Sequence, residues 1–383
     1  MAAYGDPQLP ISAELARDAF DLGDPSECSY INAAGRSPLL AAGYAAAVDG
    51  VAMKLRPWTF GDADLPRAKE LFASHLGGSA SAADVAVTPS AAYAISTVAA
   101  NTPLSPGDEV LLLEEHYASV LPWQHAAASA GATVVPVPRR PAADVTAALI
   151  DAITERTAVV TAAPCGWTDG ALVDLVAVGA ACRAVGAALV LDATQWVGAM
   201  PLDLDAIQPD AVVVSVHKWL LGLYSFAFLW LAPEGAVGRA LGSQSARSGV
   251  PLEHHDRNRI GSDDWDNGGY FIADADAAGQ PDDEAEARST PAEAGFPRTF
   301  VDGAARYDMG GRPNVVLYPP LIVGMEWLHE VGGAERIGRT LRPLTRYVRA
   351  HQRNQSVGNG VVALAACWAG SLLSLIVRLP TEW

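Results

Sequence analysis

Two short apolar runs near the middle of the chain each end in residues that could do chemistry. Residues 187–192 end in Asp192, and residues 212–216 are followed directly by His217 and Lys218. Both runs have the length and the apolar, partly β-branched composition of buried strands. A lysine amine can form a Schiff base with a carbonyl compound, and a carboxylate can pair with a protonated ring nitrogen. Pyridoxal 5'-phosphate (PLP) requires both groups, so the sequence predicts a PLP site.

The elements that would carry these residues follow an α/β pattern. From about Asp84 to Trp230, short apolar runs alternate with longer Ala-rich stretches of helical period. Such alternation predicts a mostly parallel seven-stranded sheet sandwiched by helices. The expected strands are residues 85–87, 109–113, 133–137, 158–162, 188–191, 211–215 and 227–231.

The remainder of the chain lacks this alternation and is expected to form separate regions around the α/β domain. A helix at about 65–76 and another at about 319–329 flank the α/β region, and an acidic, low-complexity stretch is too polar to order itself by burial. The expected regions are an N-terminal segment 1–80 that packs near the active site, a large domain 81–270, an acidic insertion 271–299, a return to the large domain 300–350, and a truncated or divergent small C-terminal domain 351–383.

Composition restricts the partners. The 383 residues are half apolar and carry a formal net charge of −17, which argues against nucleic acid and against anionic membrane. Four cysteines without metal-ligand spacing, together with an N-terminus unlike a signal peptide, predict a cytoplasmic protein without a metal site. Residues 361–377 contain no charge, and a buried hairpin or helix is favoured there over a membrane tail anchor.

Several motifs in a consistent order carry a resemblance to a known family. The chain resembles the class V aminotransferase group of fold-type I PLP enzymes, which includes cysteine desulfurases, selenocysteine lyases and kynureninase. The resemblance covers roughly residues 25–350. The motifs are Ser215-x-His217-Lys218 after Asp192-Ala193-Thr194-Gln195, the segments 30–38, 115–119 and 305–310, Pro122-Trp123, and Trp167-Thr168-Asp169-Gly170.

The resemblance implies roles for the residues nearest the cofactor ring. Lys218 would form the Schiff base and carry the substrate proton, and Asp192 would pair with the ring nitrogen. Gln195 would donate a hydrogen bond to the phenolic oxygen, His116 would stack on the ring and assist proton transfer, and Trp167 would also lie at the cofactor. The plainer alternatives are a surface lysine, a helix-capping aspartate, a helix-surface glutamine and an ordinary polar histidine.

The phosphate is expected where a strand leads into a helix at Ser90-Ala91-Ala92. The first amides of such a helix would face an anion. The family usually has Gly-Thr-Thr at these positions, so two hydroxyl donors are missing. The resemblance implies that Ser215 and His217 supply side-chain donors, whereas Ser90 alone could be a helix cap.

Substrate contacts are expected from the N-terminal loop and from a later glycine turn. Asn32 and Arg36 lie in the family-like segment 30–38, and Arg36 could meet a substrate carboxylate. Arg306 and Arg312 flank the Gly310-Gly311 turn, a segment that in the family approaches the phosphate across a dimer interface. A solvated surface role remains open for all three arginines.

Two departures from the family affect the predicted reaction. No cysteine lies between Cys182 and Cys367, which disfavours desulfurase chemistry, and the sequence after about residue 350 no longer follows the family. The favoured function is a homodimeric PLP enzyme that acts on an amino acid or amine through Schiff base and quinonoid chemistry. Lyase or elimination chemistry is preferred over transamination. The alternative is a catalytically impaired relative that serves as a binding or scaffolding protein.

Overall fold

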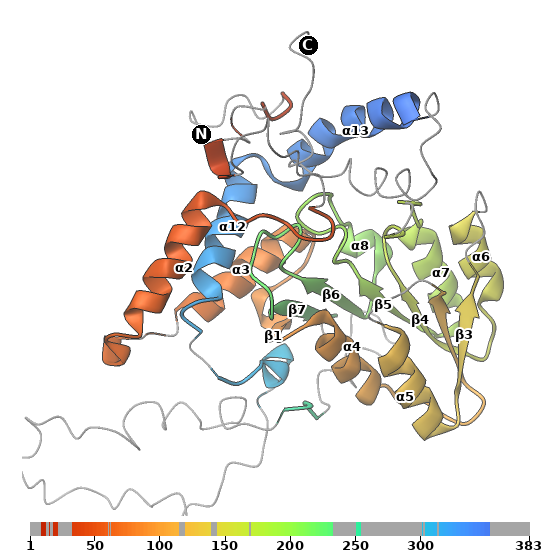
Figure 1. Cartoon of the computed structure of the whole chain (residues 1–383). Coiled ribbons are helices and arrows are strands. Elements are labelled where there is room, and N and C mark those ends of the chain that lie inside the picture. Colours follow the sequence, from red (N-terminus) through yellow and green to blue (C-terminus); the bar gives the residue numbers. More distant parts are fainter. Residues whose placement is uncertain are drawn as a thin grey trace, which may run out of the picture.

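The computed structural model describes most of the chain between residues 9 and 352 (Figure 1). The described residues are 9–12, 15, 18–21, 33–59, 61, 63–114, 119–138, 144–167, 170–232, 250–253, 301, 303–311 and 314–352, with only the backbone of 344–352. Predictions for Asn32, His116, Arg312, the insertion 271–299, the run 361–377 and nearly all of 351–383 fall outside them. Among the described helices, none is both long enough and apolar enough to cross a bilayer.

A single seven-stranded sheet forms the centre, in the order β1-β7-β6-β5-β4-β2-β3. β7 is antiparallel to its neighbours β1 and β6, and the other pairs are parallel. The predicted fold class is therefore confirmed, and no strand differs from its predicted range by more than one residue at either end. The strands are β1 Val85–Thr88, β2 Glu109–Leu113, β3 Thr133–Val137, β4 Thr157–Ala162, β5 Ala188–Asp192, β6 Ala211–Ser215 and β7 Ala227–Leu231.

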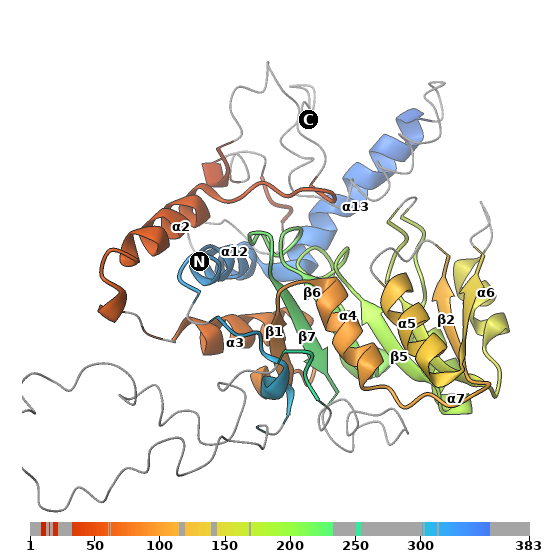
Figure 2. The same ribbon diagram turned by 60° about the horizontal axis from the view of Figure 1, so that its bottom comes forward.

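Helices cover both faces of the sheet (Figures 1 and 2). Buried side chains of α4 and α5 pack on one face, while those of α3, α6, α7 and α12 pack on the other. The helices are α2 Ala41–Met53, α3 Asp64–Leu76, α4 Ala91–Ala100, α5 Val120–Ala130, α6 Val145–Ala152, α7 Leu175–Val185, α8 Leu204–Ile207, α12 Tyr318–Glu330 and α13 Gly333–Gln352, with 3-10 helices η2 Pro57–Thr59, η3 Ala82–Asp84 and η6 Ala304–Tyr307.

Local sequence explains where many of these helices begin and end. Asp144 and Asp174 cap α6 and α7, because each carboxylate accepts a backbone N–H of the first turn. At the other end, α5 and α7 stop at Gly131 and Gly186, which adopt the left-handed conformation that glycine tolerates best. These short connections return the chain to the next parallel strand.

α3 attaches the N-terminal region to the sheet beside β1 and β7. Phe72 of α3 stacks on Phe228 of β7 with ring centroids 4.2 Å apart. On the same helix, Lys69 Nζ lies 2.7 Å from Asp308 Oδ2, and both side chains are buried. The other oxygen of Asp308 accepts the N–H of Val87 in β1 at 2.8 Å. This buried ion pair therefore joins α3, β1 and the segment after η6.

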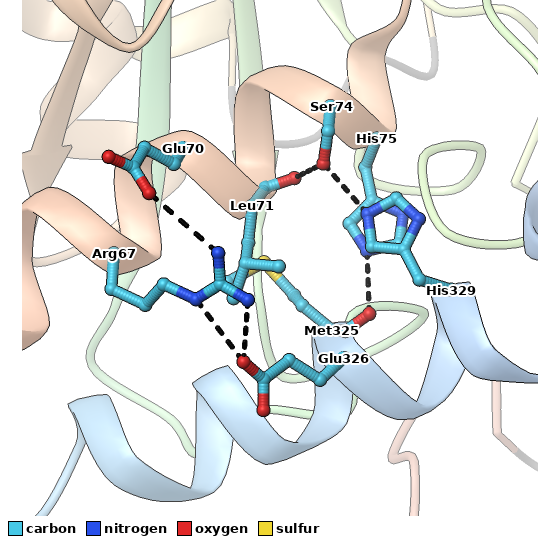
Figure 3. A network of polar contacts seen from close by, with 8 residues as sticks. All are labelled: Arg67, Glu70, Leu71, Ser74, His75, Met325, Glu326 and His329. Carbon is cyan, nitrogen blue, oxygen red and sulfur yellow. Dashed lines mark hydrogen bonds and ion pairs between the residues drawn. The ribbon is translucent and has the colours of Figure 1, made fainter.

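A polar network joins α3 to α12 (Figure 3). The rings of His75 and His329 stack with centroids 4.0 Å apart. Ser74 Oγ donates to Leu71 O at 2.6 Å, so the 2.7 Å contact between Ser74 Oγ and His329 Nε2 must place a hydrogen on the imidazole nitrogen. His75 Nε2 lies 2.9 Å from the carbonyl oxygen of Met325 and donates to it. Each ring can make its contact in the neutral form, with the hydrogen on Nε2.

The network should make the fold sensitive to acid. Burial, followed by the charge of His329, lowers the pKa of His75 to about 4, although the bond to Met325 O acts in the opposite direction. The pKa of His329 is also lowered, first by burial and then by Arg67, while Glu326 raises it. Below about pH 6.5 these histidines bind protons in the unfolded chain but stay largely unprotonated in the folded chain. The free energy of unfolding therefore falls as the pH decreases.

We expect the free energy of unfolding to be about 2 kcal/mol lower at pH 5 than at pH 7.5 because of His75. Urea unfolding at both pH values measures this difference. His75→Phe, which keeps an aromatic ring in the stack, should remove most of the pH dependence. His125→Phe on the exposed side of α5 is the matched control, and an equal effect of both substitutions would contradict the prediction.

Candidate active site

The predicted site residues follow strands that end at the same edge of the sheet. In β5 and β6, Asp192 pairs with Val213, so the two carboxyl ends are adjacent. In the other direction Ser215 pairs with Ala227 of β7, and Ala227 pairs with Thr88 at the end of β1. Because neighbouring strands are about 4.8 Å apart, residues after β1, β5 and β6 lie within reach of one small molecule.

Thr194 fastens the turn after β5 to the end of β6. Its hydroxyl oxygen accepts the N–H of Ser215 at 3.0 Å. Its own N–H donates to Asp192 Oδ1 at 3.0 Å, which orients the carboxylate. Asp192 is half-buried and caps this turn, which is not the start of a helix. Asp192 therefore does act as a cap, of a turn and not of a helix, and this uses one of its two carboxylate oxygens.

Gln195 lies in the same turn and connects it to two other parts of the chain. Its Oε1 accepts the indole N–H of Trp219 at 3.0 Å. Its Nε2 donates to the carbonyl oxygen of Ala34 at 3.3 Å. The residue is half-buried and belongs to no helix, so the interpretation as a helix-surface glutamine is wrong. Gln195 joins the N-terminal loop to the residue after Lys218.

Lys218 sits in the short connection between β6 and β7, in apolar surroundings. It is half-buried, and Trp219 and Leu220 beside it are 6% and 0% exposed. The connection is tightly packed, since a Cβ at Gly198 would lie 2.4 Å from Trp219 O and one at Gly324 would lie 2.8 Å from Leu220 O. The backbone that directly follows Lys218 is therefore held in place at this edge.

His217 is oriented by an aromatic neighbour. Its ring stacks on Tyr224 with centroids 4.4 Å apart and an interplanar angle of 20°. Burial, and then the charge of Lys218, lower the pKa of His217. The imidazole is accordingly neutral at pH 7 and can donate one hydrogen bond.

The start of α4 presents donors next to these residues. Ser90 Oγ accepts the N–H of Tyr93 at 3.1 Å, so Ser90 is a helix cap. Capping uses the hydroxyl only as an acceptor, which leaves its hydrogen for an anion. Ala91 and Ala92 occupy the first two helical positions, whose N–H groups have no partner within an α-helix. The capping and anion-binding interpretations of Ser90 are therefore compatible.

The remaining predicted residues are placed by their exposure and by their neighbours along the chain. Trp167, 46% exposed, follows Cys165, whose Sγ lies 3.8 Å from the carbonyl oxygen of Gln195. Arg36 is exposed, two residues after the Ala34 carbonyl that Gln195 contacts. Arg306 is only 6% exposed, so a solvated surface role is wrong for this arginine. His116, Asn32 and Arg312 lie outside the described residues.

Sequence reasoning assigned no role to three residues that hold this site together. Thr194 and Trp219 lie within or directly after the quoted motifs, and Tyr224 follows six residues after Lys218. Their closeness in sequence to motif residues is the feature from which a structural role could have been predicted. Their side-chain partners come from other strands and loops, which no local pattern reveals.

Comparisons with known proteins agree on one family. Residues 63–233 match the family described as Aminotransferase class-V. A "Probable cysteine desulfurase" of Vibrio cholerae is 32% identical over 146 residues, which are 37% of this chain and 36% of the relative. A "Probable cysteine desulfurase" of Aeropyrum pernix is 32% identical over 138 residues, 35% of this chain and 33% of that protein. The matches thus span only about a third of the length of these relatives.

Solved structures extend the similarity of fold over more of the chain. The cystine C-S lyase C-DES, in complex with cysteine persulfide, aligns with a TM-score of 0.66 at 18% identity over 85% of this chain and 78% of that one. The cysteine desulfurase CsdA of Escherichia coli aligns with a TM-score of 0.66 at 17% identity over 90% of this chain and 77% of that one. The chain therefore has the fold-type I architecture.

Proposed function

We propose that this chain, whose residues 63–233 match the class V aminotransferase family, is a PLP-dependent enzyme that acts on an amino acid or a related amine. The observation that carries the proposal is the Thr194 bridge between the turn after β5 and the end of β6. It orients the carboxylate of Asp192 next to the strand that leads to Lys218. An amine and a carboxylate at neighbouring strand ends are the pair that this cofactor requires.

The donor set suits the cofactor as a whole. Lys218 would hold its aldehyde carbon, Asp192 its ring nitrogen and Gln195 its phenolic oxygen. The phosphate would accept hydrogen bonds from Ser90, Ser215 and His217 and from the first amides of α4. Polar side chains gathered at the carboxyl edge of such a sheet favour a ligand of this kind.

The protein's contribution to the reaction would be binding and proton transfer. When bound, PLP supplies an electron-withdrawing ring that stabilises negative charge at the substrate Cα. Lys218, half-buried among apolar residues, would take the Cα proton once its amine is neutral. Asp192 would pair with the protonated ring nitrogen. Arg36, exposed on the loop that Gln195 contacts, would receive the substrate carboxylate.

Elimination or lyase chemistry is the favoured outcome. Cys165 and Cys182 are both buried, so among the described residues neither offers a mobile nucleophilic thiol for persulfide formation. The similarity to C-DES, which is named a cystine C-S lyase, supports the same direction. A sulfur-containing amino acid is the first substrate class to examine.

A homodimer in the cytoplasm completes the proposal. Tyr44, Val48 and Val51 of α2 are 67%, 48% and 57% exposed and follow the spacing of one helix face. An apolar helix face of this kind suits a contact with a second copy. The buried free thiols of Cys165 and Cys182 suit a reducing compartment.

The test uses the full chain with added PLP. We expect a visible absorbance band, and we expect borohydride reduction to fix the cofactor on the peptide that contains Lys218. The chain has only three lysines, Lys54, Lys69 and Lys218, so mass mapping is unambiguous. Failure to label that peptide would overturn the proposal.

A panel of amino acids then separates an enzyme from a binding protein. Cysteine, cystine, alanine and kynurenine should perturb the band to different extents, and release of sulfide or pyruvate would identify a lyase. A band that no amine perturbs would instead favour the scaffolding alternative.

A further inference from the structure

The Trp219 side chain has a single polar atom, and that atom contacts the side-chain amide of Gln195, whose two ends differ in hydrogen-bonding character. The indole Nε1 donates to Gln195 Oε1 at 3.0 Å, and Gln195 Nε2 donates to Ala34 O at 3.3 Å. The three residues form a chain that runs from the Lys218 connection through the β5 turn to the N-terminal loop.

The chemistry of the two ends fixes the orientation of the central amide. An indole N–H can only donate and a backbone carbonyl can only accept. The side of Gln195 that faces Trp219 must therefore be oxygen, and the side that faces Ala34 must be nitrogen. Of the two amide hydrogens, Ala34 takes one, which leaves the second for a bound acceptor.

Trp219 is well suited to impose this orientation because it cannot easily move. The side chain is 6% exposed, and its backbone carbonyl lies so close to Gly198 that a Cβ there would come within 2.4 Å. Gly198 has a φ of 98°, a conformation that favours glycine. Gln195 itself is only half-buried, and without the indole only the 3.3 Å contact with the Ala34 carbonyl would oppose a 180° turn of its amide.

We propose that Trp219 is a positioning residue, which holds the Gln195 amide so that its NH₂ group faces the phenolic oxygen of the cofactor. This inference rests on the proposed function. Without the indole N–H, Gln195 can present its oxygen to the cofactor oxygen, and two acceptors then face each other. Trp219 acts through Gln195 and need not touch the cofactor.

Three quantities should change in Trp219→Phe. PLP affinity of the apoprotein should weaken about three- to tenfold, the effect of one neutral hydrogen bond. The pH midpoint of the visible band should rise by about 0.5 unit, since the amide N–H favours the more negatively charged, deprotonated chromophore. In the apoprotein, hydrogen exchange at residues 33–36 should be faster, because the loop loses an oriented partner.

Trp196→Phe is the matched control. Trp196 is the next residue after Gln195, and its indole N–H donates to Pro201 O at 2.7 Å, away from the amide. Both substitutions delete one indole hydrogen bond and leave a smaller ring. Urea unfolding of both variants measures the general cost to the fold. If Trp219→Phe proves less stable than the control, Trp219→His restores an N–H donor and should recover part of the midpoint shift.

A double-mutant cycle with Gln195→Leu gives the sharpest outcome. If Trp219 acts through Gln195, Trp219→Phe should change neither the affinity nor the midpoint in the Gln195→Leu background. Equal effects in both backgrounds, or equal effects of Trp219→Phe and Trp196→Phe, would overturn the inference. A wild-type chain that binds no PLP would instead refute the proposed function, while hydrogen exchange at residues 33–36 would still test the Trp219 contact.

Discussion

Lys218→Ala should abolish the visible band of the PLP-loaded protein and lower turnover about 10²- to 10⁴-fold, the range for loss of a positioned acid or base. Neither of the two other lysines is available to replace it. Lys54 is exposed beyond α2, and Lys69 is committed to Asp308. Absorbance and single-turnover kinetics with the same amino acid measure the two effects.

Two further variants distinguish the loss of the Lys218 amine from other effects of a substitution in that experiment. Lys54→Ala changes an exposed lysine outside the site and should leave both the band and turnover unchanged. Asp192→Asn should keep the band and still slow turnover, because the amide cannot hold a proton on the ring nitrogen. A Lys218→Ala protein that retained the band would refute the assignment of the amine.

Lys69→Met is expected to lower the free energy of unfolding by about 3–5 kcal/mol, because it removes the positive charge next to the buried carboxylate of Asp308. The two charged atoms are 2.7 Å apart, and the side chains are 10% and 4% exposed. Typical domains are stable by only about 5–15 kcal/mol, so this is a large share. Urea unfolding of the apoprotein measures it.

The same helix offers a matched control with the opposite environment. Arg67 contacts Glu326 at 2.7 Å, but the two side chains are 48% and 40% exposed. Arg67→Met should therefore cost at most about 1 kcal/mol. Adding Asp308→Asn to Lys69→Met should recover part of the loss, since the amide oxygen can still accept the Val87 N–H. Equal losses for Lys69→Met and Arg67→Met would contradict the role of burial.

The sheet and its functional edge could be predicted from sequence for a physical reason. Buried parallel strands are continuous apolar runs, and helices between them end at glycine or begin at aspartate, so each element is marked locally. Asp192 and Lys218 were identifiable because each directly follows such a run. The resemblance to a family then supplied their expected roles.

The contacts that hold the site together were not predictable in this way. Lys69 occupies a polar position of an amphipathic helix and looks solvent-exposed, yet its partner lies 239 residues away. Gln195 and Trp219 meet across 24 residues, and His75 meets His329 only because α3 and α12 are adjacent. Sequence periodicity records which face of an element is apolar, and it contains no information about which polar atoms meet between elements.

The antiparallel β7 has a consequence for how this protein can change over time. Parallel neighbours need a long crossover, which absorbs added or lost residues, whereas β6 and β7 are joined directly through residues 216–226. A single residue inserted within β7 itself would turn the side chains on one side of the insertion to the opposite face, exchanging residues such as Phe228 and Leu229 between the two cores. The connection that bears Lys218 is also closely packed, through Trp219 and Leu220, against Gly198 and Gly324. Length variation in descendants of this gene should therefore accumulate in the helical crossovers and spare both β7 and this connection.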